Sequence, residues 1–250
     1  VLARYREAYA RIFGAVPDLA DRSRFPADGK PGTPAWDAMA PADQKLVNQI
    51  FANVGKALAA YERQIRPAAV ALDRYIAGDT AALTEKEKDG LLRFFELGCV
   101  HCHHGPMLTD GSFHNIRFGT GRTDGAADRG WIDGAAELLK SEFRGNGTFS
   151  DDPTAAVWLA GLKPAPEMLG QMKTPSLRGV ADTVPLGHGG DLATIEKLVE
   201  RYSERGLPAT DTRAAGERDP GLVKFDKLGS QAAELAEFLR TLKGSLVYPM

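Results

Sequence analysis

Five consecutive residues, Cys99-Val100-His101-Cys102-His103, constrain this chain more than any other feature. Two cysteines separated by two residues and followed directly by histidine form the attachment signal of a c-type haem. One helical turn lets both thiols reach the two vinyl groups of a porphyrin and form thioether bonds. His103 then lies under the iron, where histidine is a usual proximal ligand. The chain contains only these two cysteines, so no other thiol competes for the haem.

Other uses of the same residues stay open. A structural zinc site could draw on His101, His103 and His104, but neighbouring side chains diverge and the sequence offers no second ligand pair. A redox-active cysteine pair would be expected in a βαβ setting, which the sequence lacks, and a plain disulfide is a further alternative. We favour covalent haem c. Because haem c is attached outside the bacterial cytoplasm, the motif predicts a periplasmic or secreted protein.

Composition excludes some classes of partner. The chain has 250 residues, of which 43% are hydrophobic and 26% charged, enough for one large domain or two small ones. A formal net charge of −2 does not suggest a nucleic-acid partner. No apolar run approaches the roughly 18 residues of a membrane helix, so no membrane insertion is expected. No signal peptide is visible and the first residue is Val1, so we expect a mature, processed or truncated product.

Hydrophobic periodicity predicts a mostly helical chain with long irregular loops and no strand. Helices are expected over 1–16, over 42–65, from about Pro67 to Ile76, from Thr84 to just before Gly98, and over 194–205. Pro67 either ends the helix before it or starts the next one. Ser230 is expected to cap a last helix that ends at Gly244. Loops are expected over 17–41, 105–170 and 207–229, where proline, glycine and aspartate recur.

Three of these helices carry more detailed expectations. The first should bury Tyr5, Ile12, Phe13 and Val16. The helix over 42–65 has the strongest signal, a continuous apolar stripe of Leu46, Val47, Ile50, Phe51, Val54, Leu58, Tyr61 and Ile65. Thr84 and Glu87 form a capping box for the helix that leads into the haem motif.

The segments 98–110, 113–115, 173–178 and 183–188 resemble, in order and spacing, the C-terminal half of the bacterial di-haem cytochrome c peroxidases and their MauG-type relatives. The agreement extends over roughly residues 42–243. Several motifs in one order make this resemblance far more specific than the haem motif alone.

The resemblance implies a helical segment over 1–83, which links to or completes an upstream haem domain, followed by a c-type cytochrome domain over 84–250. In that family the N-terminal haem reacts with peroxide, the C-terminal haem passes electrons or holds oxidising equivalents, and calcium lies between them. The single motif here resembles the C-terminal one. The peroxidatic motif, the distal acid and the tryptophan between the haems have no match, so no catalytic residue is assigned.

The resemblance also assigns ligands residue by residue. Cys99 and Cys102 would bind the haem covalently, and His103 would be its proximal ligand. The family's sixth-ligand position is Tyr202, fourteen residues after His188. Peroxidases of the family have methionine there and MauG-type enzymes tyrosine. A phenolate is a hard anionic donor that stabilises ferric and higher states.

Alternatives to this ligand set stay open. Tyr202 could be a packed core residue, with His188 or no protein ligand in its place. Three methionines could also serve, although none falls at the family position: Met107, Met168 and Met172.

Further residues carry implied roles. His188 matches a histidine beside the haem that would hydrogen-bond a propionate or water, or it is simply a buried histidine. Thr183 and Pro185 match positions whose backbone carbonyls bind calcium, a metal that prefers oxygen ligands. Each of the three tryptophans, Trp36, Trp131 and Trp158, is expected in a core or rim, with an electron-relay role as the alternative.

The leading hypothesis is a peroxidase-type oxidoreductase that uses hydrogen peroxide, with this chain's haem storing or relaying oxidising equivalents toward a protein side chain. The alternatives are a cytochrome c peroxidase that takes electrons from a small redox protein, and a mono-haem electron-transfer cytochrome. Expected partners are a second haem domain or fragment, a redox protein or protein substrate, and peroxide. Expected cofactors are haem c and calcium.

Overall fold

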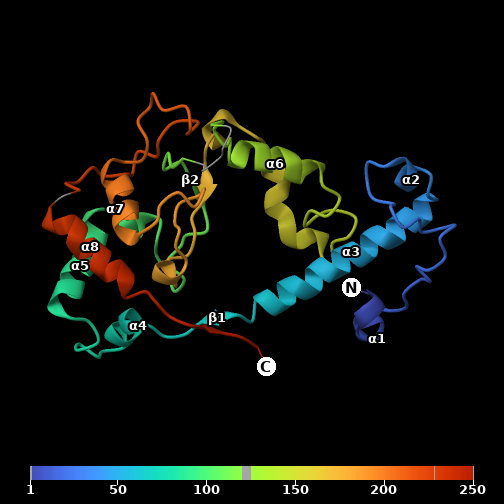
Figure 1. The fold of residues 1–250 in the computed structure, drawn as a ribbon, viewed down its shortest axis with the longest axis horizontal. Helices are drawn as coiled ribbons and strands as arrows, with labels where there is room; N and C mark the ends of the chain where they lie inside the picture. Colours follow the sequence, from blue (N-terminus) through green and yellow to red (C-terminus); the bar gives the residue numbers. More distant parts are fainter. Residues whose placement is uncertain (1, 120–124, 228, 250) are drawn as a thin grey trace. The chain divides into compact units, whose positions relative to one another are not determined.

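The computed structural model describes residues 2–119, 125–227 and 229–249, and Figure 1 shows its fold. The α-helices are α1 (Leu2–Phe13), α2 (Pro34–Asp37), α3 (Pro41–Glu62), α4 (Ala71–Ile76), α5 (Glu85–Glu96), α6 (Trp131–Lys140), α7 (Ile195–Ser203) and α8 (Ser230–Arg240). Short 3-10 helices are η1 (Cys99–His101), η2 (Pro153–Gly161), η3 (Pro166–Met168) and η4 (Val180–Asp182). The prediction of a mostly helical chain is confirmed.

Strands are short. Among the described residues, β1 (Arg66–Pro67) pairs antiparallel with β4 (Leu246–Val247), and β2 (Phe113–His114) pairs antiparallel with β3 (Met172–Lys173). No helix in the described part of the chain is long and apolar enough to cross a bilayer. The prediction of no strand is therefore nearly right, because each of these strands has only two residues.

The chain forms two compact units. The first comprises the residues up to Ile65 together with Glu142–Ala155, and the second comprises Arg66–Ser141 and Ala156–Tyr248. The division expected from the family, a linking segment to residue 83 and a haem domain from residue 84, stays a prediction.

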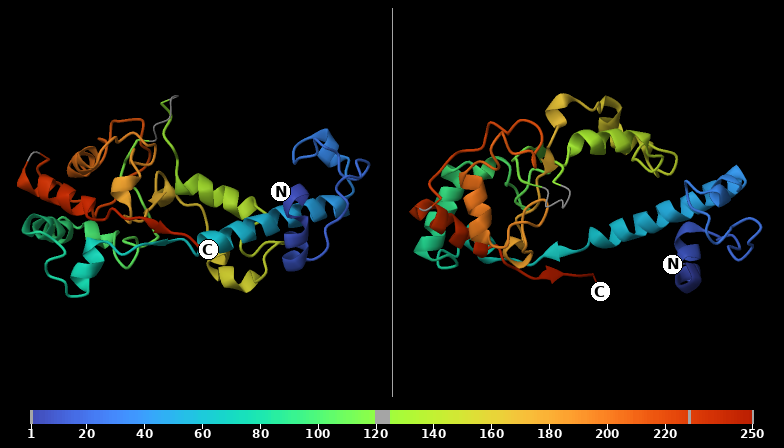
Figure 2. Two further views of the ribbon diagram at one scale, coloured as in Figure 1. Left: turned by 60° about the horizontal axis from the view of Figure 1, so that its bottom comes forward. Right: turned by 45° about the horizontal axis from the view of Figure 1, so that its top comes forward.

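The core of the second unit is built on α5, α7 and α8, which lie side by side in Figures 1 and 2. Gly90 lets α5 approach α8 closely: a β-carbon there would clash with the Glu234 carbonyl oxygen and lie 2.8 Å from the Phe238 β-carbon. The rings of Phe94 and Phe238 pack at 5.3 Å between centroids, and both are buried. This helix pair delivers the chain to the haem motif.

One helix start follows the predicted chemistry, one has a cap that was not predicted, and one differs from its prediction. Thr84 caps α5 and forms the expected box with Glu87. Thr194 caps α7, with its hydroxyl accepting from the Lys197 amide. The prediction that Ser230 caps the last helix was wrong, because Gly229 holds the N-cap position and Ser230 is the first helical residue.

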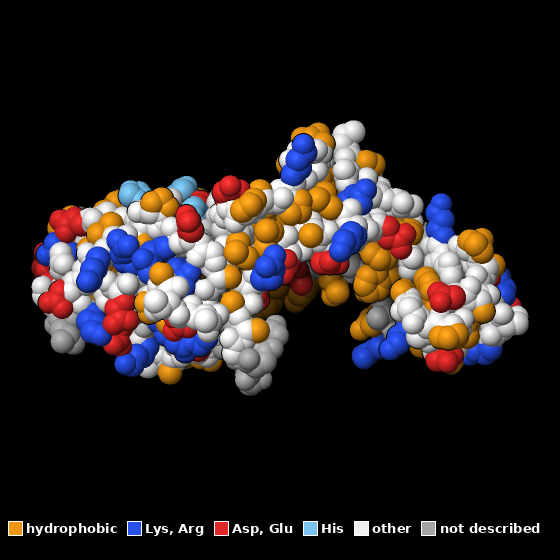
Figure 3. Space-filling view, turned by 90° about the horizontal axis from the view of Figure 1, so that it is seen from above, with side chains coloured by type: hydrophobic (Ala, Val, Ile, Leu, Met, Phe, Trp, Pro, Cys, Tyr) orange, Lys and Arg blue, Asp and Glu red, His pale blue; other side chains and the backbone are white. Residues whose placement is uncertain are grey.

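In the first unit, the pattern of buried side chains on helix α3 differs from what its apolar stripe predicts. Its buried residues are Asp43 and Asn53, whereas Phe51 and Leu58 on its apolar stripe are 66% and 57% exposed. Figure 3 shows exposed hydrophobic side chains among the charged ones on one face of the molecule. The stripe therefore predicts the helix correctly, but only half of its eight residues are even half-buried, and the other half, Leu46, Phe51, Leu58 and Tyr61, is exposed.

The first predicted helix has a different buried side from the expected one. Tyr9 is the buried residue of α1, and its hydroxyl accepts from the Asn53 side-chain amide at 2.8 Å. Tyr5 and Ile12 are exposed. The expectation was wrong for these two residues because the helix meets its unit at Tyr9, whereas Phe13, which packs on Tyr9, and Val16 are half-buried.

The predicted loops contain more structure than expected. Trp36 is buried in α2, with Phe25 and Met39, which agrees with its expected core role. The loop predicted over 105–170 holds α6, η2 and η3, so that prediction was wrong there. Recurring glycine and aspartate hid these short elements. Pro67 lies in β1, and the helix expected from it begins at Ala71.

Candidate haem-binding site

The second unit encloses a cavity of about 570 Å³, within the usual size range of cofactor sites. Its wall comes from the end of α5, η1, β2, β3, the segment after η4, α7, α8 and the residues 219–225. Every site residue expected from the sequence lines this cavity: Cys99, Cys102, His103, Thr183, Pro185, His188 and Tyr202.

One tight turn positions the haem motif. Gly98 takes a left-handed conformation (φ 76°) directly after α5, and η1 then carries the chain through the cysteines. The His103 amide donates to the Cys99 carbonyl at 2.9 Å. Glycine suits this position because left-handed backbone is strained for other residues. Both thiols and the imidazole thus come from one turn.

The two thiols form no disulfide, and burial favours the protonated form of each. Burial raises the pKa of Cys99 to about 12. Burial, with the nearby carboxylates of Asp110 and Asp219, raises the pKa of Cys102 to about 11. A reactive redox pair needs a lowered thiol pKa, so this environment argues against that alternative.

His103 is oriented as a metal ligand would be. Its side chain is buried, with 8% of the residue exposed, and burial lowers its pKa and favours the neutral ring. Its Nδ1 lies 3.1 Å from the Leu108 carbonyl oxygen. A carbonyl only accepts, so Nδ1 carries the proton and Nε2 keeps its lone pair for a metal. A hydrogen bond of this kind fixes ring orientation in many metal sites.

Leu108 adopts an unusual backbone conformation to make that contact, with φ at 52°. Few residues other than glycine, asparagine and aspartate take positive φ without strain. The neighbouring backbone is held on both sides, because the Leu108 amide donates to Gly105 and the Asp110 amide donates to Cys102. The loop after the motif is thereby shaped around His103.

Tyr202 lies on the inner side of α7 with Leu198 and Val199, as the helix periodicity predicted. Its ring packs edge-on against Phe118 at 5.0 Å. Burial raises the pKa of its phenol above the usual range, and the thiols of Cys99 and Cys102 add to the shift. Tyr202 lines the same cavity as Cys99 and Cys102.

The alternative ligands separate by position. Met107 and Met168 do not line the cavity, whereas Met172 on β3 does. His188 lines it but is exposed, so the alternative of a simply buried histidine was wrong, and its Nε2 lies 3.4 Å from an Asp128 carboxylate oxygen. Thr183 directly follows η4, and Pro185 forms a cis peptide bond with Val184.

The tryptophans expected in core or rim positions differ from one another. Trp131 starts α6 and stacks on Phe113 at 4.2 Å, which places it beside a second, smaller cavity rather than the main one. Trp158 is exposed, so its expected core or rim position is wrong. The relay role remains an untested alternative for both.

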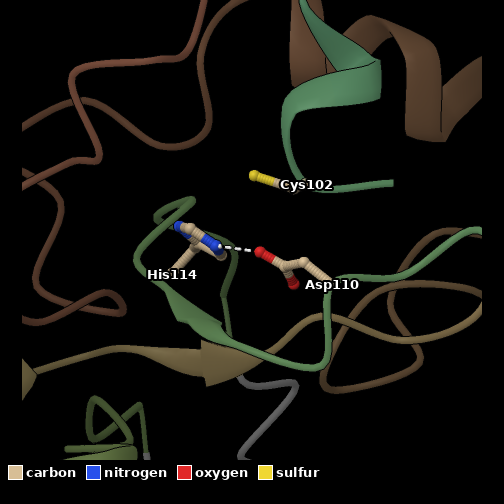
Figure 4. A group of neighbouring side chains, drawn as sticks. All are labelled: Cys102, Asp110 and His114. Atoms are coloured by element: carbon tan, nitrogen blue, oxygen red, sulfur yellow. Dashed lines mark hydrogen bonds and ion pairs between the residues drawn. The ribbon is translucent and has the colours of Figure 1, made fainter. Parts of the chain in front are cut away.

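Sequence reasoning missed His114 as a site residue. Its Nε2 lies 2.8 Å from Asp110 and its Nδ1 lies 2.7 Å from Asp219. Figure 4 shows His114 directed at Asp110, with the Cys102 sulfur nearby. His114 falls within the Phe113-His114-Asn115 segment, but only the fold brings Asp219 to it.

Cys102, Asp110 and His114 form the one cluster among the described residues whose ligand atoms could hold a metal ion, all within 4.8 Å of one another. Both nitrogens of His114 already contact carboxylates, and within the described part of the chain no fourth residue joins the cluster to complete a tetrahedral site. The cluster is a hydrogen-bonded bridge, and it lends no support to the zinc alternative.

Asn115 and Arg117 extend this bridge along the chain. The buried Asn115 amide donates to the carbonyls of Leu169 and Ala215. The buried Arg117 guanidinium donates to the Leu207 carbonyl and to further backbone oxygens between 208 and 216. The segment 113–117, which includes the cavity-lining His114, is therefore bonded both to Leu169 and to the segment 207–216.

No protein-family model matches the chain. Cytochrome-c peroxidase IdrP1 of Denitromonas iodatirespirans is 33% identical over 175 residues, which cover 66% of this chain and 43% of that protein. IdrP1 of Pseudomonas sp. (strain SCT) is 30% identical over 199 residues, which cover 76% of this chain and 49% of that protein. Methylamine utilization protein MauG of Methylorubrum extorquens is 26% identical over 196 residues, covering 76% and 44%.

One solved structure is a MauG-like protein associated with microbial copper homeostasis, with 29% identity, a TM-score of 0.47, and coverage of 69% of this chain and 51% of that one. This chain spans about half the length of the relatives it matches. The matching sequences agree with the haem motif and the cavity that it lines, and the chain belongs to the family of bacterial di-haem cytochrome c peroxidases and MauG proteins.

Proposed function

We propose that this chain binds one haem c covalently through Cys99 and Cys102, with His103 as the proximal ligand, and acts in peroxide-dependent oxidation. In this role its haem stores or relays oxidising equivalents. One observation carries the proposal: a single cavity is lined by the whole attachment motif and by Tyr202 and His188.

The residues that line the cavity fit a covalently bound haem c. The two sulfurs and His103 come from one turn, the free Nε2 of His103 is the only lone pair left on that ring, and the Leu108 carbonyl holds the ring in place. Apolar side chains such as Phe94, Leu198 and Leu235 form much of the wall. When bound, haem supplies one-electron chemistry at its iron. The chain's own part is to attach it, orient it and keep water from it.

Tyr202 is the proposed sixth ligand. It lies on α7 within the wall of the cavity that Cys99 and Cys102 also line. An anionic phenolate stabilises oxidised iron, which suits a haem that holds oxidising equivalents more than one that stores electrons. His188 is proposed to hydrogen-bond a propionate or water at the cavity edge.

Calcium and a second haem portion complete the proposal. The carbonyls of Thr183 and Pro185 would supply two calcium ligands. The exposed apolar side of α3, with Phe51 and Leu58, is where an upstream haem portion would pack, because this chain spans only about half of its relatives. The proposed location is the periplasm, and the proposed substrate is a protein side chain.

Two other functions each have a supporting observation. Several relatives are named cytochrome-c peroxidases, which favours peroxide reduction with electrons from a small redox protein. The single attachment motif favours a mono-haem electron-transfer cytochrome. Rapid peroxide turnover with a reduced small cytochrome would select the first, and failure of any second haem portion to copurify would select the second.

The ligand assignment is tested by Tyr202→Phe in the haem-loaded chain. The variant should lose the tyrosinate-to-iron signature in the visible and resonance Raman spectra, because phenylalanine offers no oxygen. Tyr248→Phe is the matched control, since Tyr248 is exposed and lines neither cavity. A Tyr202→Phe spectrum identical to that of the parent would refute the assignment of Tyr202 as the sixth ligand.

The function as a whole is tested by counting covalent haems. We expect one haem per chain by mass spectrometry, lost in a Cys99→Ser, Cys102→Ser double variant, and two haems per particle when the upstream portion is present. A particle that carries one haem and turns over no peroxide would leave electron transfer as the better function.

A further inference from the structure

The Asp110–His114–Asp219 bridge has no place among the haem ligands proposed above, yet it lines the cavity. His114 and Asp219 both contribute to the wall. The two carboxylate contacts of His114, at 2.8 Å and 2.7 Å, are short for nitrogen–oxygen pairs and typical of charge-assisted hydrogen bonds.

The geometry defines the charge of the bridge. Ionised carboxylates only accept hydrogen bonds, and a neutral imidazole has a single N–H. Contacts from both ring nitrogens to carboxylates therefore require the imidazolium form. Desolvation lowers the pKa of His114, but the contacts with Asp110 and Asp219 outweigh it and raise the pKa overall. The bridge thus holds one positive and two negative charges.

The bridge also joins the two loops that shape the cavity. Asp110 belongs to the loop after the motif, and its amide donates to the Cys102 carbonyl at 2.8 Å. Asp219 belongs to the loop whose residues 221–225 line the cavity, and its amide donates to the Asn115 carbonyl. Removal of the imidazolium would leave two carboxylates facing each other at this junction.

We propose that His114 is a positioning residue. It joins the loop after the haem motif, which contains Asp110, to the 219–225 loop, and it holds a fixed positive charge beside the haem attachment point. One of its ring nitrogens lies within 4.8 Å of the Cys102 sulfur, one of the two proposed attachment atoms. A charge so near a low-dielectric site acts strongly on the oxidation state of a bound group. The inference rests on the proposed function.

The experiment compares midpoint potentials of haem-loaded variants. His114→Gln removes the positive charge, so the potential should shift lower than in the parent, because a more negative site favours ferric iron. Asp219→Asn removes a negative charge, so its potential should shift higher. His114→Lys keeps a cation between the carboxylates and should stay nearer the parent than His114→Gln does.

Glu167→Gln is the control, because it removes one negative charge from an exposed residue that lines neither cavity. A merely structural role would shift the potentials of His114→Gln and Asp219→Asn in the same direction or leave them unchanged. Either result would overturn the proposal. Haem content is measured first. A parent chain without covalent haem would instead refute the proposed function.

Discussion

At the scale of single residues, Arg178 supports the haem motif from outside the cavity. Its guanidinium forms two hydrogen bonds with Asp73 on α4, at 2.6 Å and 2.7 Å. Its Nε donates to the Pro106 carbonyl in the loop that follows His103. With only 10% of the Arg178 side chain and 29% of the Asp73 side chain exposed, this pair is well shielded from solvent. The loop around His103 therefore depends on a partner from a separate helix.

We predict that Asp73→Asn destabilises the chain by about 1–3 kcal/mol, because it leaves a mostly buried guanidinium without its carboxylate. The hydrogen bonds from Arg178 lower the pKa of Asp73 below its usual range. The contribution of the pair is therefore complete above the unfolded pKa of about 3.9 and is lost as pH falls through the lower folded value.

Urea unfolding from pH 7 down to pH 2 checks this prediction. The difference in the free energy of unfolding between the parent and Asp73→Asn should narrow only in the acid range. Asp133→Asn is the control, since the pair that Asp133 on α6 forms with Arg129, just before the helix, is more than half exposed and should contribute little. A gap that persists unchanged at pH 2 would contradict the assignment of the stability to this pair.

At the scale of elements, the crossing of α5 and α8 depends on Gly90. We predict that Gly90→Ala destabilises the second unit by about 1–3 kcal/mol, because the new methyl group must push α5 away from Glu234 and Phe238. The gain in helix propensity, about 1 kcal/mol, should not offset this overpacking.

Gly55→Ala provides the opposite case within α3. Nothing lies within 4 Å of a β-carbon at Gly55, so only the propensity term remains and the substitution should stabilise the helix. Circular dichroism during thermal unfolding measures both. If Gly90→Ala were as stable as the parent, the close approach of α5 and α8 would not be the constraint described above.

At the scale of the whole molecule, the proposed calcium site is incomplete within this chain. Calcium takes six to eight oxygen ligands, and the two carbonyls of Thr183 and Pro185 fall well short of that number. We therefore predict that the isolated chain binds calcium only weakly, and that tight binding appears when an upstream haem portion joins it. Calorimetric titration with calcium chloride checks both states, and micromolar binding by the isolated chain would refute this division of ligands.

The sequence by itself determined the local features of this protein. The spacing of Cys99, Cys102 and His103 sets which atoms one turn can present, and the Thr84 box and the α7 periodicity act through neighbours three or four residues away. Such interactions are short in range, so a pattern in the chain predicts them directly. The motif order also predicted the family.

Only the tertiary structure decided which polar groups meet across long separations. Asp219 reaches His114 from 105 residues away, and Asp73 reaches Arg178 from the same separation. The burial of Asp43 and Asn53 on α3, opposite to what its apolar stripe suggested, likewise follows from what packs against that helix. Periodicity marks a face of a helix, but the fold decides what, if anything, covers it.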